Sequence, residues 1–441
     1  MYKLSVKGAG RLEGKLKVQG SKNAVLPILA ACLLCRGECI IHNCPCLSDV
    51  NKSLEILKSL GCSVSYCDGT VTVNSELADN YIIPCELVKS IRSSFIFMGA
   101  MLGTFNKAQI CLPGGCNIGL RPVDLHIEAF KQLGCTVNAE DDINFYAEKA
   151  KNNPTAVVLK FPSVGATENI MLYASTLDGI TQIINAAKEP EIIDLQRFLN
   201  KMGANISGAG TSVITIYGTK KLKGCEYTVM ADRIEQATLM SAIGAAGGFA
   251  ELDGCCNSCI LSYREFLKNL GVVINCPNDS KCIVRSNGKL MPYGGIINIS
   301  TMPYPGFATD CQSIAMAMLA MSNGTGTIRE TIFENRLQTA DELTKMGADI
   351  KTNGKTAYIK GAGKLYGANV TAHDLRCGAS LVIAGLCAEG VTKIDNAFYI
   401  LRGYENLDGK LNSIGAKIER DDNFDKYQSR EQTKKTEEQQ I

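Results

Sequence analysis

A cysteine and an arginine lie five residues apart on a segment whose glycines and prolines disfavour helix. Residues 112–126 read Leu-Pro-Gly-Gly-Cys-Asn-Ile-Gly-Leu-Arg-Pro-Val-Asp-Leu-His, which places the thiol at Cys116 and the guanidinium at Arg121. Glycine and proline at these positions predict a loop. A guanidinium near a loop thiol can shift the pKa of that thiol. It can also hold an anionic substrate beside the sulfur. Most cysteines are inert apolar residues, but here we expect a reactive one.

The overall composition narrows the classes of function. The chain has 441 residues, which suggests two or three domains, and its 46 Lys and Arg nearly balance its 44 Asp and Glu. This balance argues against nucleic-acid binding and against a charged membrane-binding surface. The longest apolar run, residues 237–250, is too short and too rich in Gly and Ala to cross a bilayer. With only three histidines, carboxylate, thiol, Lys and Arg groups are the better catalytic candidates.

The 20 cysteines do not predict a disulfide framework. No charged-then-apolar signal segment opens the sequence, so we expect a reducing, cytoplasmic compartment. Two Cys-x-x-Cys pairs, Cys32 with Cys35 and Cys256 with Cys259, raise the alternative of a zinc site. The first pair lies in an apolar helical segment typical of a core, and neither pair has a histidine at ligand spacing. We therefore expect no bound metal.

A sixfold repeat with a period of about seventy residues organises the chain. Each copy ends an amphipathic helix with a large apolar residue and a glycine, and a strand pattern follows. Units of this length suit small α/β modules better than solenoid repeats. The repeated glycines are Gly61, Gly134, Gly203, Gly271, Gly347 and Gly415.

A second landmark recurs at the same period, because polar or charged residues precede each helix of small and apolar residues. Such helices are expected over residues 24–34, 94–102 and 378–388, among others. Helix N-termini attract anions, and ordinary capping accounts for Ser163 and Thr309. Capping does not account for lysine or arginine at the start of a helix. We therefore expect several of these helix N-termini to lie together and form an anion-binding cleft. The landmark residues are Lys22, Arg92, Ser163, Asp232, Arg233, Asp310, Asp374 and Arg376.

The repeat predicts two domains of three modules each. One domain is expected to comprise residues 22–230 and to carry the Cys116 loop. The other is expected to comprise residues 1–21 and 231–420, with a first strand over residues 4–18 completing it. Residues 421–441 are polar and charged, which predicts a disordered tail.

Eight motifs are spread along the chain: Gly20-Ser21-Lys22-Asn23-Ala24, the Cys116–His126 loop, Ser163-Val164-Gly165-Ala166-Thr167, Glu189-Pro190-Glu191, Asp232-Arg233-Ile234-Glu235, Phe333-Glu334-Asn335-Arg336, Asp374-Leu375-Arg376 and Arg402-Gly403-Tyr404-Glu405. Together they resemble the UDP-N-acetylglucosamine enolpyruvyl transferases (1-carboxyvinyltransferases) of peptidoglycan synthesis, over residues 3 to about 420. The resemblance implies a two-domain inside-out α/β barrel, with helices inside and sheets outside each domain. It also implies transfer of enolpyruvate from phosphoenolpyruvate to the 3-hydroxyl of UDP-N-acetylglucosamine with release of phosphate. This reaction is the first committed step of peptidoglycan synthesis.

The same resemblance assigns roles to individual residues. Cys116 would supply the proton for the methylene carbon and could form an adduct with phosphoenolpyruvate. Asp310 would accept the hydroxyl proton or orient that hydroxyl. Lys22, Arg121 and Arg402 would bind the phosphate, and Arg336 and Arg376 would line the cleft. The residues implied to contact the nucleotide sugar are Asn23, Arg92, Arg121, Pro122, Val123, Asp124, Leu125, Ser163, Val164, Gly165 and Ile332.

No cofactor is implied, since the arginines neutralise the phosphate. The expected partners are the two small-molecule substrates, with no nucleic acid and no membrane, and the expected state is a monomer. Three departures from the family pattern suggest a divergent member. Phe161 stands near the usual position of a lysine, Leu337-Gln338-Thr339 replaces a more usual Phe-Met-His, and Leu401 replaces a common aspartate.

Two other functions remain open at this point. The sister enzyme 5-enolpyruvylshikimate-3-phosphate synthase shares fold and donor, but that family lacks the Pro-Gly-Gly-Cys loop around Cys116. A non-catalytic or weakly active paralogue that binds a nucleotide sugar would fit the departures. The presence of Lys22, Cys116, Asp310 and Arg402 argues against a silent paralogue.

Overall fold

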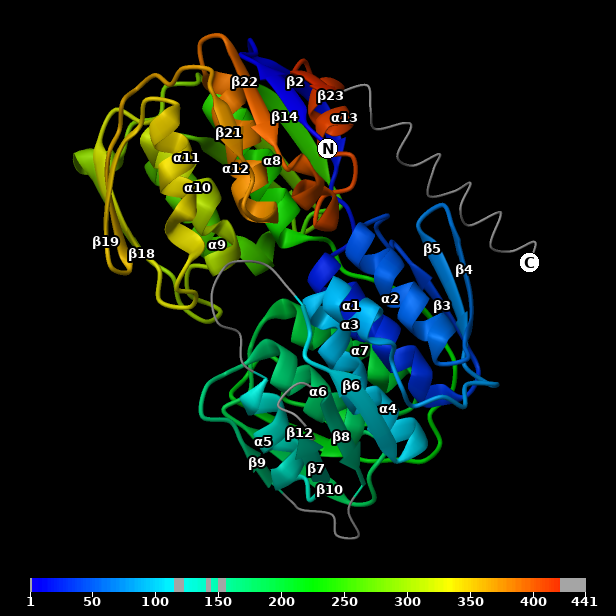
Figure 1. The fold of residues 1–441 in the computed structure, drawn as a ribbon. Helices are drawn as coiled ribbons and strands as arrows, with labels where there is room; N and C mark the ends of the chain where they lie inside the picture. Colours follow the sequence, from blue (N-terminus) through cyan, green and yellow to red (C-terminus); the bar gives the residue numbers. More distant parts are fainter. Residues whose placement is uncertain (1, 115–122, 140–143, 150–155, 421–441) are drawn as a thin grey trace.

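The protein consists of two lobes joined at a narrow waist (Figure 1). The computed structural model describes residues 2–114, 123–139, 144–149 and 156–420. Each lobe has its own core of buried apolar side chains. One core runs from Ala24 to Val229. The other joins Leu4–Val18 to residues 234–418. The domain boundaries proposed from the repeat remain a prediction, which these two separate cores support.

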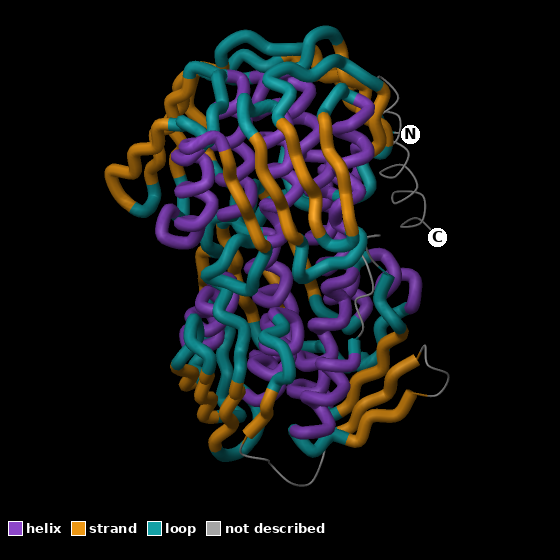
Figure 2. Tube along the Cα trace, turned by 90° about the vertical axis from the view of Figure 1, so that its left-hand side faces the viewer, coloured by secondary structure: helices purple, strands orange, loops and turns teal. Residues whose placement is uncertain are grey.

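Each lobe buries three helices of small and apolar residues at its centre, and Figure 2 shows helices enclosed by strands. These inner helices are almost wholly buried, because small side chains let them pack closely against one another. The first helix of each lobe starts at the waist. The inner helices are α1 (Lys22–Ala31), α4 (Phe97–Phe105), α6 (Val164–Ala174), α8 (Arg233–Ala246), α10 (Gln312–Ala320) and α12 (Leu375–Cys387).

Six further helices bury one face only and end at the repeated glycines. All six of those glycines have positive φ angles, from 79° at Gly134 to 107° at Gly415, which a side chain would strain. The predicted pattern of helix, glycine and strand is thus confirmed in every module. These outer helices are α2 (Ser48–Ser59), α5 (Asp124–Gln132), α7 (Pro190–Lys201), α9 (Leu261–Asn269), α11 (Thr339–Lys345) and α13 (Leu407–Asn412).

Among the described residues, six separate sheets cover the helices, one for each repeat. The first lobe holds β13–β3–β5–β4 (Glu226–Thr228, Glu38–His42, Thr70–Asn74, Ser63–Cys67), β6–β8–β7 (Lys107–Cys111, Asn144–Glu148, Thr136–Ala139) and β11–β12–β10–β9 (Asn205–Ser207, Val213–Tyr217, Ile180–Ile184, Ala156–Val158). The second lobe holds β15–β16–β14–β2 (Val273–Asn278, Lys281–Ser286, Gly248–Asp253, Leu12–Lys17), β17–β18–β20–β19 (Ile296–Ser300, Thr325–Arg329, Thr356–Lys360, Asp349–Asn353) and β21–β22–β1–β23 (Asn369–Thr371, Val391–Asp395, Leu4–Lys7, Lys417–Arg420).

The shorter elements connect these layers and carry some of the predicted site residues. They are α3 (Cys85–Ser90) and the 3₁₀ turns η1 (Cys32–Cys35), η2 (Arg92–Ile96), η3 (Asn257–Ile260), η4 (Tyr293–Gly295), η5 (Thr309–Cys311), η6 (Arg336–Gln338) and η7 (Ala397–Arg402).

The first residues of the chain contribute to the second core, and they form two strands where one was expected. Strand β1 pairs with β22 and β23, and β2 pairs in parallel with β14. Gly8 and Gly10 lie in the turn between them. At Gly8 a Cβ atom would meet the Ala388 carbonyl oxygen at 2.4 Å, so this close approach needs glycine.

Two chain segments cross the waist side by side. Gly20 and Ala231 form an isolated antiparallel bridge, flanked by bonds from Ser21 N to Met230 O (2.8 Å) and from Asp232 N to Gln19 O (2.9 Å). A Cβ atom on Gly20 would lie 1.7 Å from the Asn43 carbonyl oxygen. Only glycine therefore fits at the crossing, which accounts for the first residue of the Gly20–Ala24 motif.

The cysteines follow the prediction in one pair and depart from it in the other. Cys32 and Cys35 are buried free thiols in the first core, as expected. Cys256 and Cys259 form a disulfide, which the sequence did not indicate. The described residues contain no group of three or more His, Cys, Asp or Glu side chains placed to hold a metal ion. Across these same residues, no helix combines the length and apolar character that a membrane crossing requires.

Candidate active site

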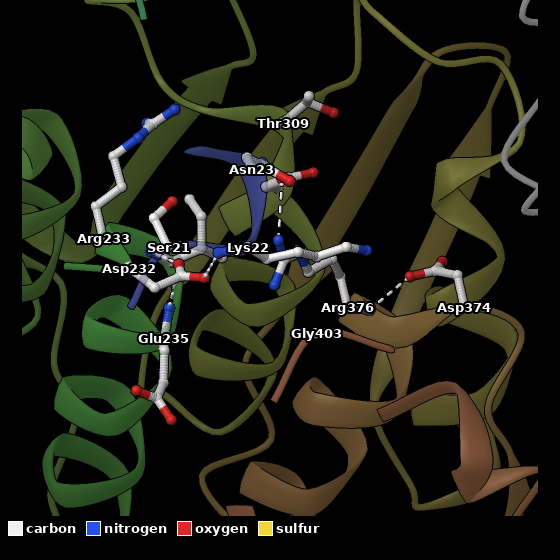
Figure 3. A network of polar contacts seen from close by, with 12 residues as sticks. Ser21, Lys22, Asn23, Asp232, Arg233, Glu235, Thr309, Asp374, Arg376 and Gly403 are labelled. Carbon is white, nitrogen blue, oxygen red and sulfur yellow. Dashed lines mark hydrogen bonds and ion pairs between the residues drawn. The ribbon is translucent and has the colours of Figure 1, made fainter. Parts of the chain in front are cut away.

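The first inner helices of the two lobes begin next to each other and share one carboxylate. Asp232 caps α8 by accepting from the amides of Ile234 (2.8 Å) and Glu235 (3.1 Å). Its other oxygen accepts from the Lys22 amide at the start of α1 (3.2 Å), as Figure 3 shows. Because helix N-termini carry unpaired N–H groups and a partial positive charge, one anion here stabilises both ends.

Lys22 and Arg402 come from different lobes and meet at a third residue, Asp49. Lys22 Nζ lies 2.7 Å from Asp49 Oδ2, and Arg402 Nε donates to Asp49 Oδ1 at 2.9 Å. The three side chains are largely buried, with 10%, 13% and 6% of Lys22, Arg402 and Asp49 exposed. Burial alone would raise the pKa of Asp49, but the two neighbouring cations outweigh it and lower that pKa. Lys22, Arg402 and Asp49 together carry a net charge of +1.

Asp310 holds a second charged cluster together. Arg336 donates to Asp310 Oδ1 at 2.7 Å, and Arg376 donates to Asp310 Oδ2 at 3.1 Å. Asn23, next to Lys22 in the chain, donates to Asp310 Oδ2 at 3.4 Å. Thus α1 from the first lobe and η5, η6 and α12 from the second lobe supply one polar cluster.

The expectation of ordinary capping at Thr309 is wrong. The residue before η5 is Ala308, and no side chain caps this turn. Thr309 Oγ1 instead donates to Glu330 Oε2 (2.9 Å) and accepts from Arg336 (2.9 Å). Arg336 draws the Thr309 side chain away from the backbone, because a charged partner forms the stronger hydrogen bond.

The arginines determine the ionisation of Asp310. Burial would raise the pKa of this carboxyl, but Arg376 and then Arg336 hold the pKa far below its usual range. Asp310 is therefore an ionised and weakly basic carboxylate at neutral pH. Arg376 is itself fixed by Tyr404, whose hydroxyl accepts from its Nη1 at 3.1 Å and contacts Thr238 Oγ1 at 3.0 Å.

The Glu-Pro-Glu motif lies across the waist from Arg233. Glu191 accepts from Arg233 Nε (2.9 Å) and Nη2 (3.2 Å), a paired, buried geometry. The Arg233 guanidinium also stacks over the Tyr304 ring, 5.5 Å from its centre. Glu168 on α6 is 2% exposed, and burial, followed by the charges of Glu191 and Glu189, raises its pKa well above the usual value.

We expect Glu168→Gln to change how stability depends on pH. Because the folded pKa of Glu168 is raised, the native state holds a proton that the unfolded chain releases, so stability falls as pH rises above the unfolded value. Glutamine does not ionise, so the Glu168→Gln variant does not lose stability in this way as pH rises. Denaturant unfolding should show the variant gaining about 1 kcal/mol or more on the parent between pH 5 and pH 8.

The control for this experiment is Glu86→Gln on α3, where the side chain is exposed. Its unfolding free energy should follow that of the parent at both pH values. Equal pH dependence in the parent and in Glu168→Gln would show that Glu168 is ionised in the folded protein.

The residues expected to bind the nucleotide lie on adjoining helices of the first lobe. Ser163 caps α6 through a bond from Ala166 N (3.4 Å), and Val164 and Gly165 begin this helix. Helix α5 starts at Asp124, after the buried Val123, and Leu125 packs on the core. The two helices pack on each other.

His126 joins these two helix starts. A Cβ atom at Gly165 would lie 2.9 Å from His126 Cε1, so the glycine permits this close approach. Asn169 Nδ2 lies 2.8 Å from His126 Nδ1. The contact gives this histidine a structural role between α5 and α6. Arg92 begins η2, which packs against both α1 and α6.

The remaining predicted residues are placed in part. Ile332 donates its amide to Glu330 Oε1 at 2.8 Å, close to the Thr309 side chain. Cys116, Arg121 and Pro122 lie outside the described residues, as does the predicted tail at 421–441. The contacts among described residues thus join Lys22, Asn23, Asp310, Arg336, Arg376 and Arg402 into two neighbouring clusters.

The sequence departures lie outside these two clusters. Leu337 is buried in the second core, and Thr339 Oγ1 donates to Ser313 Oγ at 3.1 Å. Phe161 is 44% exposed. Leu401 is partly buried on η7, beside Arg402 in the chain.

Sequence reasoning missed Asp49 and Tyr404 as members of the site. Asp49 follows Ser48 at the start of a predicted amphipathic helix, where an acid is ordinary. Tyr404 stands in the quoted Arg402–Glu405 motif, but nothing local indicates its bond to Arg376. The signal that could have found Asp49 is its position on the face that the helix buries.

Comparisons with known proteins give concordant results. The family model described as EPSP synthase (3-phosphoshikimate 1-carboxyvinyltransferase) matches residues 6–411. The chain is similar to UDP-N-acetylglucosamine 1-carboxyvinyltransferase 2 of Carboxydothermus hydrogenoformans, with 46% identity over 422 residues, 95% of this chain and 99% of that protein. The UDP-N-acetylglucosamine 1-carboxyvinyltransferase of Elusimicrobium minutum is 44% identical over 96% of this chain and 99% of its own length.

Solved structures share the fold. The enolpyruvyl transferase NikO from Streptomyces tendae superposes with a TM-score of 0.85 at 22% identity, covering 95% of this chain and 99% of that one. An EPSP synthase from Acinetobacter baumannii gives a TM-score of 0.74 at 18% identity, covering 96% and 100%. At these identities the likeness concerns the fold alone. The predicted architecture of inner helices and outer sheets is confirmed, although the six sheets form no closed barrel among the described residues.

Proposed function

The chain belongs to the UDP-N-acetylglucosamine 1-carboxyvinyltransferase family of enolpyruvyl transferases, and from this premise we propose its reaction and the residues that perform it. The protein transfers enolpyruvate from phosphoenolpyruvate to the 3-hydroxyl of UDP-N-acetylglucosamine and releases phosphate. The observation that carries this proposal is the meeting of Lys22 and Arg402 beside the Asp310 cluster. These groups come from both lobes. They present fixed positive charge where a donor with two anionic groups, a phosphate and a carboxylate, would bind.

The cationic side chains account for donor binding. Phosphoenolpyruvate carries a phosphate and a carboxylate, so its site needs several cations. Lys22 and Arg402 would hold the phosphate together with Arg121 from the loop. Arg336 and Arg376 would face the carboxylate end, where guanidinium forks favour planar anions. Tyr404 keeps Arg376 in place through its hydroxyl.

Asp310 would serve the acceptor hydroxyl and the reacting carbon. Protonation of the methylene carbon leaves positive charge on the neighbouring carbon, which a nearby carboxylate stabilises. The 3-hydroxyl oxygen then forms its bond to that carbon. Its proton becomes strongly acidic as this bond forms, so even a weak base such as Asp310 can accept it. Loss of a methyl proton and departure of phosphate complete the transfer.

Cys116 would act as the acid that protonates the methylene carbon. A thiol can donate this proton and take one back in the elimination, so the group is regenerated. Addition of the thiol S–H across the enol double bond, with the proton on the methylene carbon and the sulfur on the carbon that bears the phosphate, would give the covalent adduct that the family resemblance implies. This assignment rests on the sequence of residues 112–126.

The nucleotide sugar would bind along the first lobe. Backbone amides at the start of α6, from Ser163 to Gly165, suit a diphosphate because a helix N-terminus presents unpaired donors. Residues 121–125 would contact the uridine, and Asn23, Arg92 and Ile332 would contact the rest of the nucleotide sugar. The enzyme would act in the cytoplasm as a monomer, without nucleic-acid or membrane partners.

A direct assay tests this function and separates it from the two alternatives. We expect phosphate release from phosphoenolpyruvate only when UDP-N-acetylglucosamine is present, with enolpyruvyl-UDP-N-acetylglucosamine as the product in mass spectrometry. Release with shikimate 3-phosphate instead would identify the sister reaction. Binding of the nucleotide sugar without turnover would identify the silent paralogue that the departures at Phe161 and Leu401 allow.

A further inference from the structure

Asp49 occupies the position between the two cations that we assign to the donor phosphate. Its two carboxylate oxygens accept from Arg402 Nε (2.9 Å) and Nη2 (3.3 Å), and one of them contacts Lys22 Nζ (2.7 Å). The side chain is only 6% exposed, so water screens these charges poorly. A phosphate bound between these two cations would accept hydrogen bonds from the same N–H groups of Lys22 and Arg402.

The backbone of Asp49 is held by helix α2 and not by the two cationic side chains. Asp49 is the second residue of α2, after Ser48, and Ser53 Oγ donates to its backbone carbonyl at 3.1 Å. Helix α2 packs on α1, which carries Lys22, and on η7, which carries Arg402. The carboxylate is therefore held in place by a helix rather than by a loop that could swing away.

We propose that Asp49 is a positioning residue that competes with phosphate for Lys22 and Arg402, and so sets the affinity for the donor and the release of the phosphate product. The inference rests on the proposed function in naming phosphate as the ligand. When phosphate binds, the cations must share their donors between two anions. When phosphate leaves, the bonds to Asp49 replace those that are lost, which lowers the barrier to release.

A purely structural role for Asp49 leads to a different expectation. In that case Asp49 would only hold two flexible cationic side chains and favour the N-terminus of α2. Its removal would loosen Lys22 and Arg402 and weaken phosphate binding. The sign of the change in phosphate affinity therefore distinguishes the two roles.

The test is calorimetric binding of inorganic phosphate to the full-length parent and to Asp49→Asn, with UDP-N-acetylglucosamine present. The amide keeps the shape and one acceptor oxygen but removes the charge. We expect phosphate to bind about tenfold more tightly to the variant, the scale of one lost charge-assisted contact. In turnover, the KM for phosphoenolpyruvate should fall, kcat should fall because release is slower, and inhibition by phosphate should strengthen.

Asp408→Asn is the matched control. Asp408 is also the second residue of its helix, α13, and also pairs with an arginine, Arg420, but it touches neither cation of the site. The affinity of the Asp408→Asn variant for phosphate should equal that of the parent. Unchanged or weaker phosphate binding in folded Asp49→Asn, or no phosphate binding to either protein, would overturn the proposal.

Asp49→Glu covers the case in which the amide variant fails to fold. Its carboxylate keeps the charge and reaches further between the cations, so phosphate should bind less tightly than in the parent while binding of the nucleotide sugar is retained. Tighter phosphate binding in this variant would contradict competition. Because the binding measurement needs no turnover, its result is separate from the assay of the proposed function.

Discussion

Replacing Asp310 by asparagine is expected to lower turnover by roughly a hundredfold or more, the scale of a lost general base or electrostatic partner. Asparagine keeps the size and one acceptor oxygen but neither accepts a proton nor stabilises a cation by charge. Stability should also fall, because the buried guanidinium groups of Arg336 and Arg376 lose their shared counter-ion. Thermal and denaturant unfolding should show a loss of about 3 kcal/mol.

The pH dependence gives this prediction a second readout. With its pKa held far below the usual range, Asp310 contributes stability that is present above its unfolded pKa and is lost only as pH falls through its folded pKa. Asp310 therefore stays ionised between pH 5 and 9 and cannot cause a limb of the rate profile there. The profile of Asp310→Asn should keep the shape of the parent profile at a lower level.

Asp194→Asn is the control for Asp310. Asp194 is buried on α7, and its carboxylate accepts from Tyr227 Oη (2.7 Å) and from Met230 N (3.2 Å), neither of which belongs to the two charged clusters. Its turnover should stay within a few-fold of the parent. Turnover of Asp310→Asn within that same range would remove Asp310 from the chemistry and direct the search for the base elsewhere.

Replacing Cys116 by alanine is expected to abolish most of the turnover, again by roughly a hundredfold or more, because the methylene carbon loses its acid. An epoxide phosphonate that mimics phosphoenolpyruvate should alkylate Cys116 in the parent, and faster with the nucleotide sugar bound. Peptide mapping by mass spectrometry locates the label. Cys116→Asp should keep turnover but lose the adduct, since a carboxylic acid can also donate a proton.

The control here is Cys46→Ala. Cys46 is an exposed thiol close to the site, where its backbone amide donates to Glu405 Oε1 at 3.0 Å. This variant should keep both turnover and labelling of Cys116. A label found mainly on Cys46 or on other exposed thiols would show that the loop thiol is not the reactive one.

Local sequence signals predicted the architecture well. A glycine after an amphipathic helix marks a backbone conformation that other residues rarely adopt, so the six copies located six helix ends and six following strands. The charged helix starts were also predicted, because Lys22, Arg92, Arg233 and Arg376 are unusual where the helix dipole disfavours cations. These signals need only a few neighbouring residues.

The pairing of those charges could not be predicted from one sequence. Asp49 and Arg402 are 353 residues apart, and their contact follows from how two lobes pack. Thr309 was expected to cap a helix because threonine favours that position, yet Arg336 from η6 provides a stronger partner for its hydroxyl. The division of the first strand in two depends on sheet partners, β14 and β22, that lie far along the chain.

The pairing of β1 and β2 imposes an order on the synthesis of the protein. The first core, from Ala24 to Val229, can close as soon as that stretch has left the ribosome, since all its sheets lie within it. Strands β1 and β2 emerge earlier still but must remain unpaired until β14, β22 and β23 are made. A nascent chain stalled before residue 417 should therefore hold one finished lobe and one unfinished lobe with exposed strand edges. The unfinished half is the part that a chaperone would need to protect.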